Sequence, residues 1–284
     1  MSKEQITRNS LKSSFLKQTI IKVDYDYLFD DYINEVMKKI DSFLGERGYV
    51  IENKYMSEFG LKVDFERLNN DENANFLDNI NLEKDKREKY YSFTNNDKRI
   101  RIDITKEYFA ITVDYLEYIP FEELNELYEK IMEELKNVRS NIKIKRVGLR
   151  KFNIYMMKNI EDIGNFFEDD IFSFASKNLN SYSFLGKSSL DIYSYNGYKV
   201  NQTANIAQGY MSTDTEETTT VYQLILDFDV YVDQIEKDVS LTDMNDNLFS
   251  IYKNSLKEDF LIRLKENNFK DERIFKLWHL IWPQ

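Results

Sequence analysis

Apolar and polar residues alternate with a period of two in segments spread along most of the chain. The cleanest run is YQLILDFDVYV at residues 222–232. This spacing is typical of β-strands that bury one face and expose the other. Shorter runs of the same kind lie at residues 21–29, 100–104, 109–115 and 142–154. Because Lys106-Glu107 joins two of these runs directly, the sequence predicts antiparallel hairpins.

Two longer segments carry apolar residues at helical spacing. The first, residues 121–138, follows Pro120, whose missing N–H is no loss at a helix start. The second covers residues 243–268. A hairpin followed by a long helix therefore occurs twice, at 99–139 and at 204–268. The pattern predicts an α+β fold of two similar halves, each an antiparallel sheet backed by long helices.

The expected organisation has three parts. Residues 1–18 form a flexible N-terminal arm, residues 19–158 form the first half, and residues 159–284 form the second half. The chain of 284 residues contains only 2 Pro and 8 Gly, so no long linker separates the halves. We therefore expect the second half to be closely packed on the first.

Several local patterns refine this expectation. Residues 33–44 and 160–174 have the apolar spacing of helices. Residues 66–89 are strongly polar, which predicts a surface insertion with room for one short helix. Asn95-Asn96-Asp97 is typical of a hairpin turn. The apolar alternation changes frame around Gly148, which predicts a bulge or a sharp strand bend.

The stretch from Leu135 to Ile160 is basic and contains no Asp or Glu, although the whole chain has a net charge of −11. Its basic residues are Lys136, Arg139, Lys143, Lys145, Arg146, Arg150, Lys151 and Lys158. The remainder of the chain is therefore even more acidic than the total. We expect this stretch to be central to the fold, because its strand pattern lies between the two predicted halves.

The basic stretch has three interpretations, one of which is docking of another protein. It could bind phosphates, with bidentate contacts from Arg146 and Arg150 and stacking from Phe152 and Tyr155. Direct nucleic-acid binding through residues 136–158 and ligand binding by Lys143, Lys145, Arg146 and Arg150 both belong to this interpretation.

The second interpretation pairs the basic strand with acidic strands of the same sheet. Asp227 and Asp229, or Asp24 and Asp26, are the obvious partners, since opposite charges across strands stabilise a sheet. We favour this second interpretation, because the overall negative charge repels phosphates at long range.

Asp227 and Asp229 lie two residues apart, so a strand would direct both carboxylates to one face. Two such carboxylates can approach one Mg²⁺, as in metal-dependent nucleases and phosphoryl-transfer enzymes. No catalytic strand of the Glu-x-Lys type follows at short range, and solvated acids on a strand face are common. We keep the metal site as the alternative interpretation.

Composition excludes several kinds of chemistry. The chain has no Cys, which excludes disulfides, Cys-ligated zinc and Cys nucleophiles. His279 is the single His, and the sequence contains no serine nucleophile elbow for which it could act as a general base. Neither a P-loop nor a dinucleotide-binding glycine motif occurs. We expect no cofactor and lean against an enzyme. The polar N-terminus and the lack of a long apolar run predict a cytoplasmic protein without a membrane span.

The C-terminal segment contains Trp278 and Trp282 in an apolar context. These two residues either dock on the core of the chain or anchor a partner, because Trp is enriched at interaction hot spots. Both remain candidate binding residues.

Four segments together resemble a known family. KRVGLRKFNIY (145–155) is similar to the central GLRY-N-R signature of a sporadically distributed, uncharacterised prokaryotic family of about this length. LILDFDVYVD (224–233), LFSIYKNSLKEDFLIRL (248–264) and IIKVDYDYLFD (20–30) are similar to its acidic late strand, closing helix and opening strand. Lys151 and Tyr252 stand where that family more often has an aromatic residue and a His. The resemblance implies the fold and a bacterial or phage origin, and it transfers no functional residue.

The sequence therefore predicts a non-enzymatic protein-binding or regulatory protein of a bacterial or phage conflict system. A defence component, an antitoxin or an inhibitor would fit. Such a protein would present acidic surfaces to a basic protein, for example one that normally holds nucleic acid. The alternative is the metal-dependent nuclease or phosphoryl-transfer enzyme that uses Asp227 and Asp229, and a homo-oligomer is left open.

Overall fold

The structure is a computed structural model. It describes residues 3–11, 14–63, 80–116, 119–172, 186–212, 218–233, 239–266 and 273–275.

In these described ranges, ten strands form one antiparallel sheet in the order β2-β3-β4-β5-β1-β6-β9-β8-β7, and the short β10 pairs with β6. The strands are β1 (Leu16–Tyr25), β2 (Val50–Val63), β3 (Ile80–Asn95), β4 (Ile100–Ile104), β5 (Tyr108–Asp114), β6 (Ile144–Met157), β7 (Gly186–Tyr195), β8 (Tyr198–Ser212), β9 (Thr218–Asp233) and β10 (Ile274–Phe275). The strands expected in two separate sheets are joined through the pair of β1 and β6.

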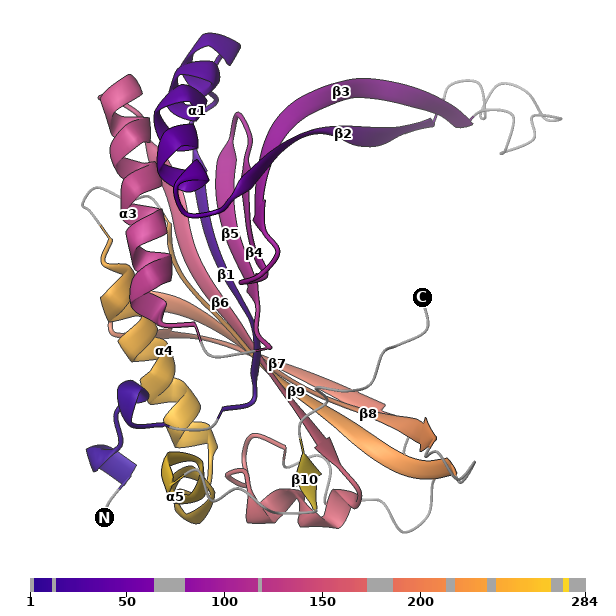
Figure 1. Ribbon diagram of the computed structural model, residues 1–284. Coiled ribbons are helices and arrows are strands. Elements are labelled where there is room, and N and C mark those ends of the chain that lie inside the picture. Colours follow the sequence, from indigo (N-terminus) through magenta and orange to yellow (C-terminus); the bar gives the residue numbers. More distant parts are fainter. Residues whose placement is uncertain are drawn as a thin grey trace, which may run out of the picture.

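The helices lie along one face of this strongly twisted sheet (Figure 1). They are α1 (Asp30–Gly45), α3 (Phe121–Val138), α4 (Leu241–Ser255) and α5 (Glu258–Glu266), with the 3-10 turns η1 (Lys3–Gln5), η2 (Arg8–Ser10) and η4 (Ile160–Asn165). The predicted stripe of α3 is buried, including Leu124, Ile131 and Leu135. The α+β class is therefore confirmed, with more sheet than helix.

Two predicted helices differ from the structure. The segment 243–268 is interrupted, because Leu256 adopts extended backbone angles and bridges Phe167. The N–H of Lys257 donates to the carbonyl of Phe166, and the N–H of Glu168 donates to the carbonyl of Ser255. The segment expected as a helix at 160–174 is a short 3-10 turn in its first part, since its backbone pairs with this interruption. Phe174 lies outside the described residues.

The irregularity predicted around Gly148 lies three residues earlier, at Lys145, and not at Gly148 itself. The register of β6 with β9 runs unbroken from Arg146 to Met157, and its register with β1 is also regular opposite Gly148. The β1–β6 register instead shifts at the two ends of their pairing, between Asp24 and Tyr25 and between Leu16 and Gln18. Each shift accommodates one extra residue, Lys17 in β1 at one end of the pairing and Lys145 in β6 at the other.

The last part of the polar insertion expected at 66–89 is a β-strand in the structure. β3 begins at Ile80 and pairs with β2 as a long hairpin that projects from the body of the sheet (Figure 1). The expected short helix falls outside the described residues, apart from Ile80. The turns predicted at Asn95–Asp97 and at Lys106-Glu107 are confirmed, since they join β3 to β4 and β4 to β5.

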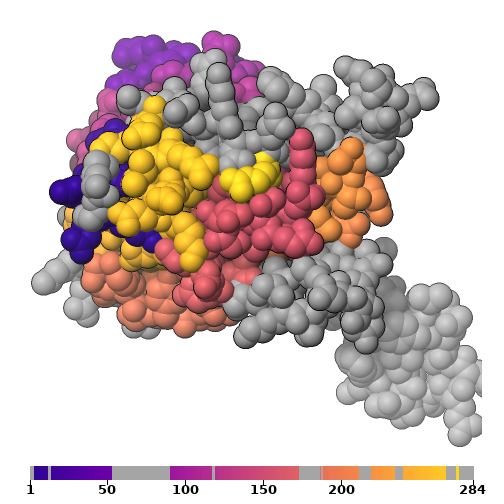
Figure 2. All heavy atoms as spheres, turned by 90° about the horizontal axis from the view of Figure 1, so that it is seen from below, coloured from indigo at the N-terminus to yellow at the C-terminus, as the bar shows by residue number. Residues whose placement is uncertain are grey.

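The described part of the N-terminal arm is docked, which corrects the expectation of a flexible arm at residues 1–18. Ile6 and Phe15 are each 1% exposed, and β1 already begins at Leu16. Lys3 forms an ion pair with Glu168 (2.8 Å). Figure 2 shows the N-terminal residues in indigo beside the yellow residues of α4 and α5.

An aromatic cluster fixes this end of the molecule. The ring of Phe260 on α5 lies 6.0 Å from that of Phe15, 6.4 Å from that of Tyr155 and 5.1 Å from that of Phe166. Phe260 is fully buried. One side chain therefore connects the arm, strand β6, the segment after β6 and helix α5.

We predict that Phe260→Ala lowers the free energy of unfolding by about 3–5 kcal/mol, because it leaves a cavity among four elements. Urea unfolding followed by circular dichroism measures the change. The matched control is Phe29→Ala, whose side chain is 67% exposed and should cost under about 0.5 kcal/mol. Equal effects of the two substitutions would contradict the proposed role of the cluster.

Candidate functional site

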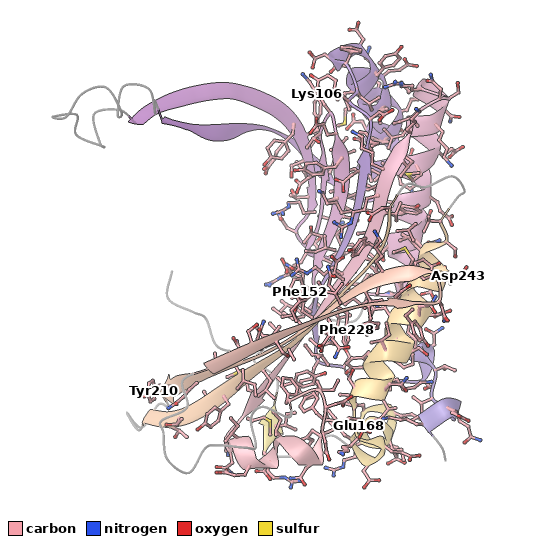
Figure 3. The ribbon with its side chains drawn as sticks, turned by 180° about the vertical axis from the view of Figure 1, so that it is seen from behind. Lys106, Phe152, Glu168, Tyr210, Phe228 and Asp243 are labelled. Atoms are coloured by element: carbon pink, nitrogen blue, oxygen red, sulfur yellow. The ribbon has the colours of Figure 1, made fainter. Side chains whose placement is uncertain are left out.

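The face of the sheet opposite the helices carries four of the residues singled out from the sequence, Arg146 and Arg150 on β6 and Asp227 and Asp229 on β9. On β9, Leu226, Phe228 and Val230 are buried, and Phe228 contacts Tyr252 of α4 edge-on. The intervening residues of β9 lie on the opposite side, together with the alternate residues of β6. Figure 3 labels Phe152 and Phe228 on these two neighbouring strands near the middle of the sheet. We call this surface the open face.

The side chain of Arg146 lies along the open face and passes over Gly148. Its Nη2 donates to Oδ2 of Asp229 (2.9 Å), and its guanidinium lies 4.0 Å from the ring centre of Tyr231. In the strand register, Tyr231 is directly opposite Gly148. A Cβ built on Gly148 would lie 3.7 Å from an Asp229 oxygen and 3.8 Å from Nε of Arg146. The missing side chain at residue 148 thus gives the guanidinium its path to the carboxylate.

Arg150 holds the second carboxylate. Its Nε donates to Asp227 Oδ1 (3.0 Å) and its Nη2 donates to Oδ2 (2.6 Å), a bidentate pair. The guanidinium also lies 4.5 Å from the ring centre of Phe152. The side chain of Asp227 is only 8% exposed, whereas that of Arg150 is 45% exposed. Asp227 is therefore a nearly buried charge that depends on one arginine.

Burial and charge oppose each other at these acids. Burial raises the pKa of the Asp229 carboxyl above its usual value, and the guanidinium groups of Arg146 and Arg150 act in the opposite direction. The hydrogen bonds to Asp227 raise the pKa of Arg150. Both effects identify the four side chains as one coupled group, which we call the Arg–Asp ladder (Arg146, Arg150, Asp227 and Asp229).

The interpretation of the basic stretch as an internal partner of acidic strands is confirmed at three of its residues. Besides the two ladder arginines, Nζ of Lys145 lies 3.8 Å from a carboxylate oxygen of Asp26. Lys143 is exposed, and its carbonyl accepts a hydrogen bond from the N–H of Asp26. Three of the four carboxylates named from the sequence, Asp26, Asp227 and Asp229, are therefore observed partners, whereas Asp24 forms an ion pair with Lys22 (2.7 Å).

The alternative metal site gains no support from this geometry. Asp227 and Asp229 both face arginines, and no third His, Asp or Glu joins them in a metal-binding group among the described residues.

We predict that Arg150→Met lowers the free energy of unfolding by about 2–4 kcal/mol, because the nearly buried Asp227 carboxylate loses its partner. The control, Lys145→Met, removes an exposed pair and should cost under about 0.5 kcal/mol. The double variant Arg150→Met/Asp227→Leu should recover part of the loss. A loss as small for Arg150→Met as for Lys145→Met, measured by urea unfolding, would show that the ladder is not structural.

Lys151 was not predicted as a site residue, and it occupies the opposite face of β6. Its Nζ donates to Oδ1 of the fully buried Asn245 on α4 and lies 5.2 Å from the ring centre of Phe121. Burial, followed by the nearby charge of Arg8, lowers the pKa of Lys151 to about 7, and Asp246 partly opposes this shift. The signal was present in the sequence, since residue 151 follows Val147 and Leu149 in the core-facing alternation.

The sign of this pKa shift gives a pH dependence. Between the folded pKa of about 7 and the unfolded value of 10.5, the unfolded chain binds a proton that the folded chain lacks. Stability should therefore rise from about pH 7 towards pH 9.5, by at most about 1.4 kcal/mol per pH unit from this residue. Above about pH 10 the buried tyrosines Tyr25 and Tyr155, whose pKa burial raises, act in the opposite direction.

We predict that Lys151→Met abolishes this rise and increases the free energy of unfolding at pH 7 by on the order of 2 kcal/mol. Unfolding curves at several pH values between about 7 and 9.5 measure both effects. Lys158→Met, which removes an exposed lysine just after the same strand, should retain the rise. A parallel pH profile for Lys151→Met and the native chain would contradict the prediction.

The helix layer concentrates acidic residues. The sequence of α3 contains six Glu and two Lys. Glu122, Glu126, Glu129 and Glu133 are all exposed, and their spacing of four, three and four residues aligns them on the solvent face. Three of them form ion pairs, Glu122 with Arg8 (3.4 Å), Glu126 with Arg47 and Glu133 with Lys130 (2.9 Å). We call these four residues the α3 glutamate stripe.

One arginine connects the stripe on α3 to an acidic residue of α4. Arg8 lies between Glu122 of α3 and Asp246 of α4, with nitrogen-to-oxygen distances of 3.4 Å to each. The side chain of Asp246 is 61% exposed. This acidic helix surface was expected only in general terms, because the sequence does not show which elements form the outer layer.

The remaining predicted residues, Trp278 and Trp282, lie outside the described residues, as does His279. Within the described ranges, no helix is long and apolar enough to cross a membrane. Comparison with known proteins gives no further assignment: no protein-family model and no curated protein matches the chain.

Proposed function

We propose that this chain is a non-enzymatic protein-binding protein whose docking surface is the α3 glutamate stripe. The observation that carries the proposal is the exposure of Glu122, Glu126, Glu129 and Glu133 on one rigid helix. A helix that is well packed on its other face presents these carboxylates with little loss of conformational entropy on binding.

The charge distribution supports this surface over the others. On the open face, Arg146, Arg150 and Lys199 each already face a carboxylate. The stripe has an excess of carboxylates, and its surface ion pairs contribute little to stability. A basic partner can therefore replace Arg47 or Lys130 at small cost.

The partner suited to this surface is a basic protein. A regular row of carboxylates on a helix resembles the row of phosphates on a nucleic acid in charge, although not in shape. A protein that normally binds nucleic acid would be attracted to it over long range. An inhibitor or antitoxin of such a protein, acting in a bacterial or phage conflict system, is the role that we propose.

We predict that Glu126→Lys/Glu129→Lys/Glu133→Lys weakens binding of the partner at least about tenfold. The partner is first crosslinked to the native chain in the source cells, identified, and purified for titration at several salt concentrations. The control variant Glu161→Lys/Asp169→Lys/Asp170→Lys changes the net charge equally at exposed positions away from α3. Binding by the control should stay within about threefold of that by the native chain.

Three outcomes would contradict the proposal. The first is an equal loss for both variants, which would mean that only net charge matters. The second is binding of single- or double-stranded DNA that is lost in Arg146→Gln/Arg150→Gln, which would favour direct nucleic-acid binding through residues 136–158. The third is stabilisation by Mg²⁺ or Mn²⁺ that is lost in Asp227→Asn, which would favour the alternative enzyme.

We also propose that the chain consists of two related halves, with the second half beginning at β6 and not after residue 158. Strand β1 pairs with β5, the last strand of the meander that follows β1. In the same way, β6 pairs with β9, the last strand of the meander that follows β6. Each of those last strands leads to a helix, α3 or α4. This common order of elements supports the division, within which β1 and β6 form the central pair.

A further inference from the structure

Strand β7 forms one edge of the sheet, and the described residues give it little of the usual protection of an edge. In the part of the chain that the structure describes, β8 is its one paired strand. The pairing is regular over ten residues without a bulge. The strand contains no Pro, and its charged residues are Lys187 and Asp191. Natural edges usually carry bulges, prolines or several charges, which prevent pairing with another strand.

The turn between β7 and β8 fixes which backbone groups of β7 point outward. Tyr195 pairs with Tyr198, so Asn196 and Gly197 form a two-residue turn, and their φ angles of 50° and 83° are those of a type I′ turn. The pair that flanks such a turn is hydrogen-bonded, and hydrogen-bonded pairs then recur at every second residue. The N–H and C=O groups of Ser188, Leu190 and Ile192 consequently point away from β8.

The outward-pointing residues also expose apolar side chains. Leu190 is 56% exposed and Ile192 is 69% exposed. Both lie on the open face, opposite the partly buried Tyr193. An unpaired row of backbone groups beside two exposed aliphatic side chains is a template for another strand.

We propose that β7 pairs with β7 of a second copy of this chain, antiparallel and with Ser189 on the two-fold axis. Ser188 then forms hydrogen-bonded pairs with Leu190 of the other copy, and Gly186 with Ile192. All four residues have outward-pointing backbone groups. Leu190 of one copy becomes a diagonal neighbour of Leu190 of the other copy, and the two side chains are within reach of each other on the open face.

The charges of β7 select this register. With Ser189 at the centre, Lys187 of each copy is directly opposite Asp191 of the other. Opposite charges at directly opposed positions stabilise an antiparallel pair. With Asp191 at the centre, two aspartates would instead face each other in a closely spaced, non-hydrogen-bonded pair, which is destabilising. The strand is therefore self-complementary in backbone and charge about residue 189.

Sedimentation velocity of the full chain tests the dimer. We expect a reversible monomer–dimer equilibrium between about 1 and about 100 µM. The substitution Ile192→Lys should shift this equilibrium to the monomer, because each copy then brings an additional positive charge to the interface. The matched control Val50→Lys replaces a β-branched residue that is 64% exposed on β2, the other edge strand, and should leave the equilibrium unchanged. A monomer at every concentration overturns the proposal.

Single-cysteine variants test the register, because the chain has no cysteine of its own. Residues that face each other in a non-hydrogen-bonded pair have Cα atoms about 4.5 Å apart, within the range of a disulfide. Ser189→Cys should therefore form a crosslinked dimer on mild oxidation, whereas Ser194→Cys should not. Crosslinking of Asp191→Cys in preference to Ser189→Cys overturns the proposed register.

Charge exchange tests the electrostatic selection. Lys187→Asp should weaken the dimer about tenfold, since it creates two like-charge pairs. Adding Asp191→Lys should restore the dimer, because the opposed charges are opposite again. Failure of the double variant to recover dimerisation, while the native chain dimerises, overturns the assignment of these two residues. None of these variants touches the α3 glutamate stripe, so a failure here is distinguishable from a failure of the proposed function.

Discussion

The pairing of β6 with β1 on one side and with β9 on the other holds the molecule together. This central strand joins the N-terminal and C-terminal groups of strands into one sheet. Its open face is neutralised by the Arg–Asp ladder, and its other face carries Val147, Leu149 and Tyr155 into the core. The same strand thus supplies both the apolar contact with the helices and the charge contact within the sheet.

The ladder has a consequence for the rest of the surface. Its arginines are two of the three arginines of the basic stretch, the residue type suited to bidentate phosphate contacts. Both bind carboxylates two or more residues away from their directly opposed residues on β9. The diagonal reach is possible because Gly148 leaves room and because Tyr231 and Phe152 offer aromatic faces to the guanidinium groups. With these cations engaged, the negative excess of the chain falls on other elements, among them α3.

Sequence patterns predicted those features that depend on neighbouring residues. The alternation at 222–232 and the apolar stripe at 121–138 correspond to β9 and α3, and the carboxylate partners of Arg146 and Arg150 were named correctly. The division of 243–268 into α4 and α5 could not be predicted, since neither Pro nor Gly marks it. It arises from backbone hydrogen bonds to residues 166–168, which are distant in sequence. The buried amine of Lys151 likewise depends on Asn245 and Arg8, from opposite ends of the chain.

The proposed dimer and the proposed docking surface are compatible because they use different parts of the fold. Pairing at β7 extends the sheet in its own plane, and so it covers neither face. The helices α1 and α3 lie over the strands around β1, at the other side of the sheet from β7 (Figure 1). A dimer would therefore present two copies of the α3 glutamate stripe at once. A basic partner with two sites would then bind more tightly through effective concentration, without any new contact on either stripe.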